Sequence, residues 1–125
     1  DTYNANPTSM RSALRVLREF KGKRKLAVLG QMAELGHHAP QEHREVGREA
    51  AFVDFLFCSG EHAIYYLEGA RAGGLPDGRM VMTGEAMGLA QPLQETLREG
   101  DVVLVKGSRV ARMERLVAVI MKEKG

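Results

Sequence analysis

The sequence contains no tryptophan and only one cysteine, Cys58, among its 125 residues. A single cysteine excludes an intrachain disulfide and is typical of proteins from a reducing compartment. No apolar run approaches the roughly 20 residues that a bilayer span requires, and no signal-peptide pattern opens the chain. We therefore expect a cytoplasmic protein without a membrane-inserted segment.

An excess of charge of one sign is also missing. The chain has 18 basic and 16 acidic residues, a formal net charge of +2. The longest basic cluster, 21–25, is interpreted as a solvated helix end rather than a phosphate-binding patch. Nucleic-acid binders usually gather their basic residues, so no nucleic-acid partner is expected. With 44% apolar and 27% charged residues, residues 1–125 have the composition of one ordinary globular domain.

Several catalytic and cofactor signatures are absent from the sequence. It has no GxxxxGK[ST] phosphate loop and no GxGxxG after a strand, so the chain lacks a triphosphate cradle of its own. Cys58 lies in an apolar segment and is interpreted as a packing residue rather than a nucleophile. His37, His38 and His43 lack a fixed ligand geometry and a nearby cysteine, so we expect surface or capping histidines and no metal site.

The sequence does contain a regular alternation of apolar periods. Five amphipathic segments are predicted helices, beginning near Pro7, Pro40, Gly60, Ala86 and Ser108. Four continuously apolar segments between them are predicted strands: 25–29, 52–58, 79–83 and 102–105. Strands that are apolar on both faces are buried on both faces, which indicates a mainly parallel sheet between helices. Right-handed crossovers then give an α/β fold, a Rossmann-like three-layer sandwich.

Two of these helices have a predicted inner face. The first should start at Asn6 as N-cap and end at Gly22. Its apolar face is expected to comprise Met10, Ala13, Leu14, Leu17 and Phe20. The inner face of the helix that follows Gly60 is expected to comprise Ala63, Ile64, Leu67 and Ala70.

Four polar stretches follow strands or precede helices. They are DTYNANP (1–7), GQMAELG (30–36), SGEH (59–62) and KGSR (106–109). Ligands of open α/β sheets bind outside the carboxyl ends of the strands. We therefore expect these stretches to border one ligand site.

The KGSR and DTYNANP stretches carry the candidate binding residues. Lys106 and Arg109, with Ser108 at a helix start, could form an anion site for a carboxylate or phosphate, although a capping serine between two exposed cations explains the pattern as well. In the other stretch Asp1 could accept hydrogen bonds from a ribose diol, and Asn4 can donate and accept. For Asn6 alone, which has the same hydrogen-bonding capacity, an N-cap is the favoured interpretation.

Three segments also form longer motifs. They are DTYNANPTSM, GQMAELG with HREVG at 43–47, and VLVKGSRVARMERLV at 103–117. In this order and spacing they resemble the Mur ligase family, in particular its members that add D-alanyl-D-alanine to the peptidoglycan precursor. The resemblance covers residues 1 to about 120. Gln31 stands where that family usually has an acidic residue, which leaves any electrostatic role of the position open.

The resemblance implies the carboxy-terminal, amino-acid-binding domain of a three-domain ligase, and the start of the chain inside a motif suggests an excised domain. ATP and Mg²⁺, and the UDP-N-acetylmuramoyl-tripeptide, would be bound mainly by the other domains, so the isolated chain is expected to be inactive. Asp1 would meet the ATP ribose. The positions around the incoming D-alanyl-D-alanine would be Asn4, Asn6, Lys106, Ser108 and Arg109.

Two alternatives remain at this point. One is another ligase of the superfamily, such as folylpolyglutamate synthase or a different Mur ligase, although the asparagines of YNANP argue against both. The other is a free-standing Rossmann-like binding module with no ligase attached.

Overall fold

The computed structural model describes residues 5–107, and within them lies a four-stranded, wholly parallel sheet. Its strands are β1 (Lys25–Leu29), β2 (Phe55–Ser59), β3 (Met80–Thr83) and β4 (Val102–Lys106). They lie in the order β3-β2-β1-β4. The predicted parallel sheet is confirmed.

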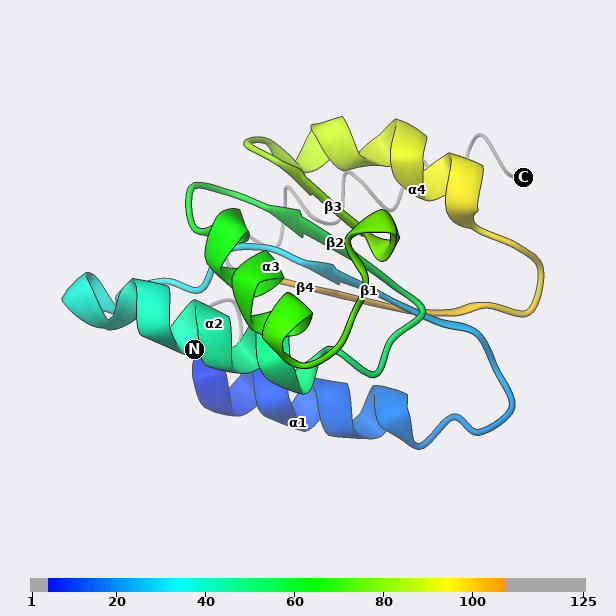
Figure 1. Cartoon of the computed structure of the whole chain (residues 1–125), viewed down its shortest axis with the longest axis horizontal. Helices are drawn as coiled ribbons and strands as arrows, with labels where there is room; N and C mark the ends of the chain where they lie inside the picture. The colour runs from blue at the N-terminus through cyan, green and yellow to red at the C-terminus, as the bar shows by residue number, and fades with distance from the viewer. Residues whose placement is uncertain (1–4, 108–125) are drawn as a thin grey trace.

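Helices cover both faces of this sheet (Figure 1). On one face lie α1 (Pro7–Arg18), α2 (Ala39–Glu49) and α3 (Ala63–Ala72), and on the other lies α4 (Ala90–Thr96). Short 3₁₀ turns, η1 (Gly36–His38), η2 (Asp77–Arg79) and η3 (Ala86–Leu89), lead into α2, β3 and α4. The three-layer sandwich is therefore confirmed. Among the described residues, no helix combines the length and apolar character that a membrane crossing needs.

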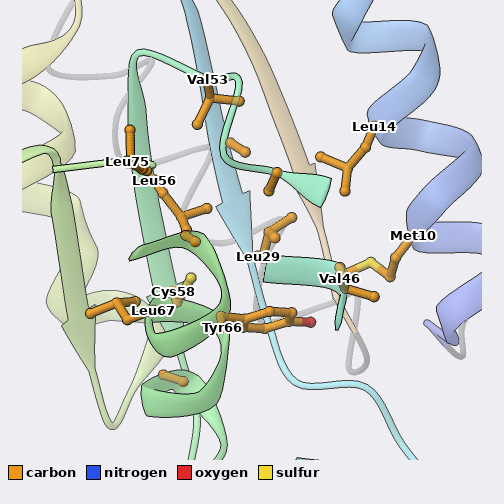
Figure 2. Close-up of a cluster of buried hydrophobic side chains, with 14 of the residues drawn as sticks. Met10, Leu14, Leu29, Val46, Val53, Leu56, Cys58, Tyr66, Leu67 and Leu75 are labelled. Carbon is orange, nitrogen blue, oxygen red and sulfur yellow. The ribbon is translucent and has the colours of Figure 1, made fainter. Parts of the chain in front are cut away.

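The strands are apolar throughout because both faces of the sheet are buried. Leu29 and Cys58 point into the cluster beneath α1, α2 and α3, and Figure 2 shows them beside Tyr66. Val28 and Phe57 point to the opposite cluster, which includes residues of η3 and α4. Cys58 is fully buried, and burial raises the pKa of its thiol. It is a packing residue, as predicted.

The start of α1 agrees with its prediction. Asn6 caps the helix, and its side chain accepts a hydrogen bond from the Ser9 N–H at 2.9 Å. The end does not agree, because α1 stops at Arg18 and Phe20 is 47% exposed. The N–H groups of Glu19 and Phe20 bond carbonyls only three residues back, so the chain tightens and turns away before Gly22.

One strand boundary and one buried position were also predicted wrongly. Strand β2 starts at Phe55 rather than Phe52, because residues 51–54 continue from α2 as turns; the Val53 N–H, for example, bonds the Ala50 carbonyl. In α3, Ile64 is 37% exposed rather than buried. The last predicted helix, beginning at Ser108, lies outside the described residues.

Helices α2 and α3 cross at two glycines. A Cβ on Gly69 would lie 1.8 Å from the Arg44 carbonyl oxygen, and one on Gly47 would lie 2.1 Å from the Tyr66 carbonyl oxygen. Real Cβ atoms do not approach backbone this closely, so only glycine permits this crossing. The contact fixes α2 against α3 and thereby places His43 beside Tyr66, with ring centroids 4.8 Å apart.

Candidate functional site

The order of the strands reverses between β1 and β4. The chain runs outward from β1 to β2 and β3, then returns to add β4 on the other side of β1. Such a reversal is where open α/β sheets bind their ligands. Leu29 pairs with Lys106 at this point, and the Gly30 N–H donates to the Lys106 carbonyl at 2.8 Å.

The segments that leave these two strands touch each other. A Cβ on Gly107 would lie 2.6 Å from the Gly30 Cα. Glycine at position 107 therefore lets the backbone of residues 106–107 lie in contact with the backbone of residues 30–32. Two of the four predicted polar stretches are thus adjacent.

The YNANP stretch reaches the same loop. The Ala33 N–H donates to the Ala5 carbonyl at 3.3 Å, and Ala5 is buried. The neighbouring Asn6 is exposed and is the N-cap, as the favoured interpretation predicted. Its backbone N–H donates to Ser9 Oγ at 3.1 Å, whereas its side-chain nitrogen Nδ2 forms no hydrogen bond within residues 5–107 and can donate to a ligand.

The SGEH stretch borders this loop as well. A Cβ on Gly60 would lie 3.0 Å from the Gln31 side-chain oxygen, so the glutamine head packs against this glycine. Exposed Glu34 has a φ of 62°, a left-handed conformation that is costly for a residue with a side chain. We name residues 5–6, 30–34, 60 and 106–107 the carboxyl rim.

Two buried side chains hold the rim loop from below. The Tyr66 hydroxyl donates to the Gly30 carbonyl at 2.7 Å. The Met32 N–H donates to Nε2 of His43 at 3.1 Å, and Nδ1 of His43 donates to the Ala39 carbonyl at 2.6 Å. The loop between β1 and η1 is therefore fixed to α2 and α3.

Sequence reasoning missed Tyr66 and misjudged His43. His43 is fully buried rather than a surface or capping residue. The signal was its spacing, because His43 lies three residues before buried Val46 on the inner face of α2. Both of its ring nitrogens are hydrogen-bonded to backbone, whereas His37 and His38 are exposed in η1. The three histidines therefore do not converge.

Burial keeps His43 neutral. It lowers the pKa of the imidazole below its ordinary value of 6.5, only partly opposed by the bond to the Ala39 carbonyl, and nearby His62 lowers the pKa further. The neutral ring is also required by the geometry, because a protonated Nε2 could not accept from Met32.

Acidification below about pH 6.5 should consequently reduce the free energy of unfolding. The unfolded chain protonates His43 near that pH while the folded chain does not, so the unfolded state binds more protons and stability is lost as the pH falls. Urea denaturation across this range measures the slope. His43→Gln should flatten it; identical slopes in wild type and His43→Gln would refute the assignment.

Four of the predicted binding residues cannot be placed. Asp1, Asn4, Ser108 and Arg109 lie outside the described residues, and their roles stay predictions. Within residues 5–107, no group of three or more His, Cys, Asp or Glu side chains could hold a metal ion.

Comparison with known proteins identifies the family of the chain. Residues 1–109 match the family model described as Mur ligase, glutamate ligase domain. The chain belongs to the Mur ligase family. The resemblance of its motifs to those of this family is thereby confirmed.

Relatives and solved structures point to one branch of the Mur ligases. The UDP-N-acetylmuramoyl-tripeptide–D-alanyl-D-alanine ligases of Bacillus subtilis and Treponema pallidum are 34% and 40% identical, over 94% and 99% of this chain. A Thermotoga maritima MurF ligase in complex with ADP superposes with a TM-score of 0.77 at 29% identity, and an Acinetobacter baumannii MurF with 0.76 at 36%. These matches cover 97% and 96% of this chain and 27% of each MurF chain. The chain spans 26% and 27% of the two curated relatives, about a quarter of their length.

Proposed function

We propose that this chain is the domain of a D-alanyl-D-alanine-adding ligase that binds the incoming dipeptide and closes over the ATP site. One observation carries the proposal: the segments that hold Asn6, residues 30–34 and Lys106 lie in contact at the carboxyl ends of β1 and β4. The relatives named for this reaction support the choice of substrate.

The chemistry of the carboxyl rim suits a zwitterion. A dipeptide needs its carboxylate held while its amine stays free to react. The Lys106 ammonium offers a charge-assisted hydrogen bond to the carboxylate, with Arg109 adding a bidentate donor by analogy with the family. The free donor of Asn6 can orient the peptide oxygen. The rim thus positions a nucleophile rather than activating an electrophile.

The activating chemistry belongs to the rest of the ligase. ATP would phosphorylate the tripeptide carboxylate, and the dipeptide amine would attack the acyl phosphate, forming the amide bond and releasing phosphate. ATP, Mg²⁺ and the UDP-linked precursor would be bound mainly by domains outside this chain, in the cytoplasm. Asp1 would meet the ATP ribose on closure.

Because ATP would be bound by other domains, we expect that the 125-residue chain alone produces no ATP-dependent ligation. It contains no phosphate loop. The assay is phosphate release from ATP with UDP-N-acetylmuramoyl-tripeptide and D-alanyl-D-alanine. The full-length protein should release phosphate only when both substrates are present. Turnover by the isolated chain would contradict the proposal. If the full-length protein instead used another amino acid as acceptor, it would be a different ligase. If it showed no ligation with any acceptor, it would be a binding module.

A further inference from the structure

A second cationic feature lies away from the carboxyl rim. A surface cavity of about 330 Å³ opens between the carboxyl-terminal parts of α1 and α2, with Phe52 and Gly73 in its wall. Its charged lining comprises four arginines and one carboxylate: Arg11, Arg15 and Arg18 from α1, and Arg48 and Glu49 from α2. The carboxyl end of α1 lies on the opposite side of the molecule from the loop that follows β1 (Figure 1).

Only one of the four arginines is neutralised by carboxylates. Arg11 bonds Glu49 at 2.6 Å and lies 3.3 Å from Glu45. Within the described part of the chain, Arg15, Arg18 and Arg48 form no ion pair. Among the described residues, the one carboxylate of the lining, Glu49, is thus paired with Arg11, and the other three arginines face the cavity without an ion-pair partner.

The negative carboxyl ends of three helices offset part of this positive charge. Arg18 and Arg48 lie in the last turns of α1 and α2, and Gly73 is the C-cap of α3. Each helix end carries roughly half a negative charge, so three ends offset at most about one and a half of the three positive charges. Capping alone thus leaves the residues that line the cavity with a net positive charge.

The guanidinium groups that line the cavity favour a small ligand with several negative charges. Guanidinium groups bind phosphate and carboxylate oxygens with paired hydrogen bonds, and a concave wall focuses their field. The Arg18 guanidinium lies 5.2 Å from the centre of the Phe52 ring, which holds it at the cavity wall. A single carboxylate would leave positive charge uncompensated, whereas a diphosphate group could match it.

We propose that this cavity binds a diphosphate-bearing ligand at a site separate from the carboxyl rim. The probe is inorganic pyrophosphate, titrated into the 125-residue chain, which carries no phosphate loop to compete for it. Nitrogen–proton spectra at about 0.15 M salt report the fold and the binding position together. The Nε–H signals of Arg15, Arg18 and Arg48 should shift saturably.

The matched pair of variants is Arg48→Gln and Arg98→Gln. Both residues are exposed and both changes remove one positive charge, but only Arg48 lines the cavity. Arg48→Gln should weaken pyrophosphate binding about tenfold and Arg98→Gln less than about twofold. The double variant Arg15→Gln/Arg48→Gln should abolish it.

Three results would overturn this site: no saturable shift at about 10 mM pyrophosphate, equal weakening by both single variants, or shifts confined to Gly30 and Lys106. None of them bears on dipeptide binding at the carboxyl rim, so this proposal can fail without the proposed function failing.

Discussion

Replacing Gly69 with alanine should destabilise the folded chain by about 3 kcal/mol or more. The new methyl carbon would lie 1.8 Å from the Arg44 carbonyl oxygen and 2.9 Å from the Arg48 nitrogen. These are backbone atoms inside α2, which cannot rotate away as a side chain can. The helices must separate, and the buried contacts between them are lost.

Urea denaturation of Gly69→Ala against Gly78→Ala measures this effect. A Cβ on Gly78 would meet nothing within 4 Å, and Gly78 has no left-handed φ, so its substitution should change stability by less than about 0.5 kcal/mol. The larger loss should also disturb the rim, because α2 and α3 carry His43 and Tyr66. Similar stabilities of the two variants would show that the helices do not cross at Gly69.

On the proposed function, Lys106→Ala in the full-length protein should lower kcat/KM for D-alanyl-D-alanine by about ten- to a hundredfold. That range corresponds to one charged hydrogen bond, worth about 1.5–3 kcal/mol. The fold should tolerate the change, because the β1–β4 ladder uses only the backbone of Lys106. Steady-state kinetics with the dipeptide varied at saturating ATP and precursor supply the measurement.

Lys21→Ala is the matched control for this variant. Lys21 is exposed and precedes β1, so it lies toward the amino ends of the strands, away from the carboxyl rim. It loses the same charge and should retain wild-type kinetics. Wild-type kinetics for Lys106→Ala as well would remove this lysine from the dipeptide site.

Much of the fold follows from local pattern. Continuous apolar runs, Pro7 after Asn6, and turn-forming glycines identified the strands and the start of α1, because each depends on residues close in sequence. Boundaries such as the end of α1 before Phe20 were missed. They depend on where the chain must turn to reach the next strand, which periodicity does not encode.

The rim was predictable as a place but not as a structure. The rule that ligands bind at the carboxyl ends of strands brought Asn6 and Lys106 to one edge. The support beneath it was not predictable, since the bonds of His43 to Met32 and of Tyr66 to Gly30 need the tertiary arrangement of α2 and α3. For the same reason a lone histidine and tyrosine in helices gave no functional signal.

Dipeptide contact can be mapped directly on the full-length protein. With a non-hydrolysable ATP analogue bound, D-alanyl-D-alanine should shift the amide signals of Gly30, Gln31, Lys106 and Gly107 along one saturation curve. The chemical shifts of residues at the amino ends of the strands, such as Lys25 and Phe55, should not change. Saturable binding that leaves the first group unchanged would contradict the role of these loops in holding the dipeptide.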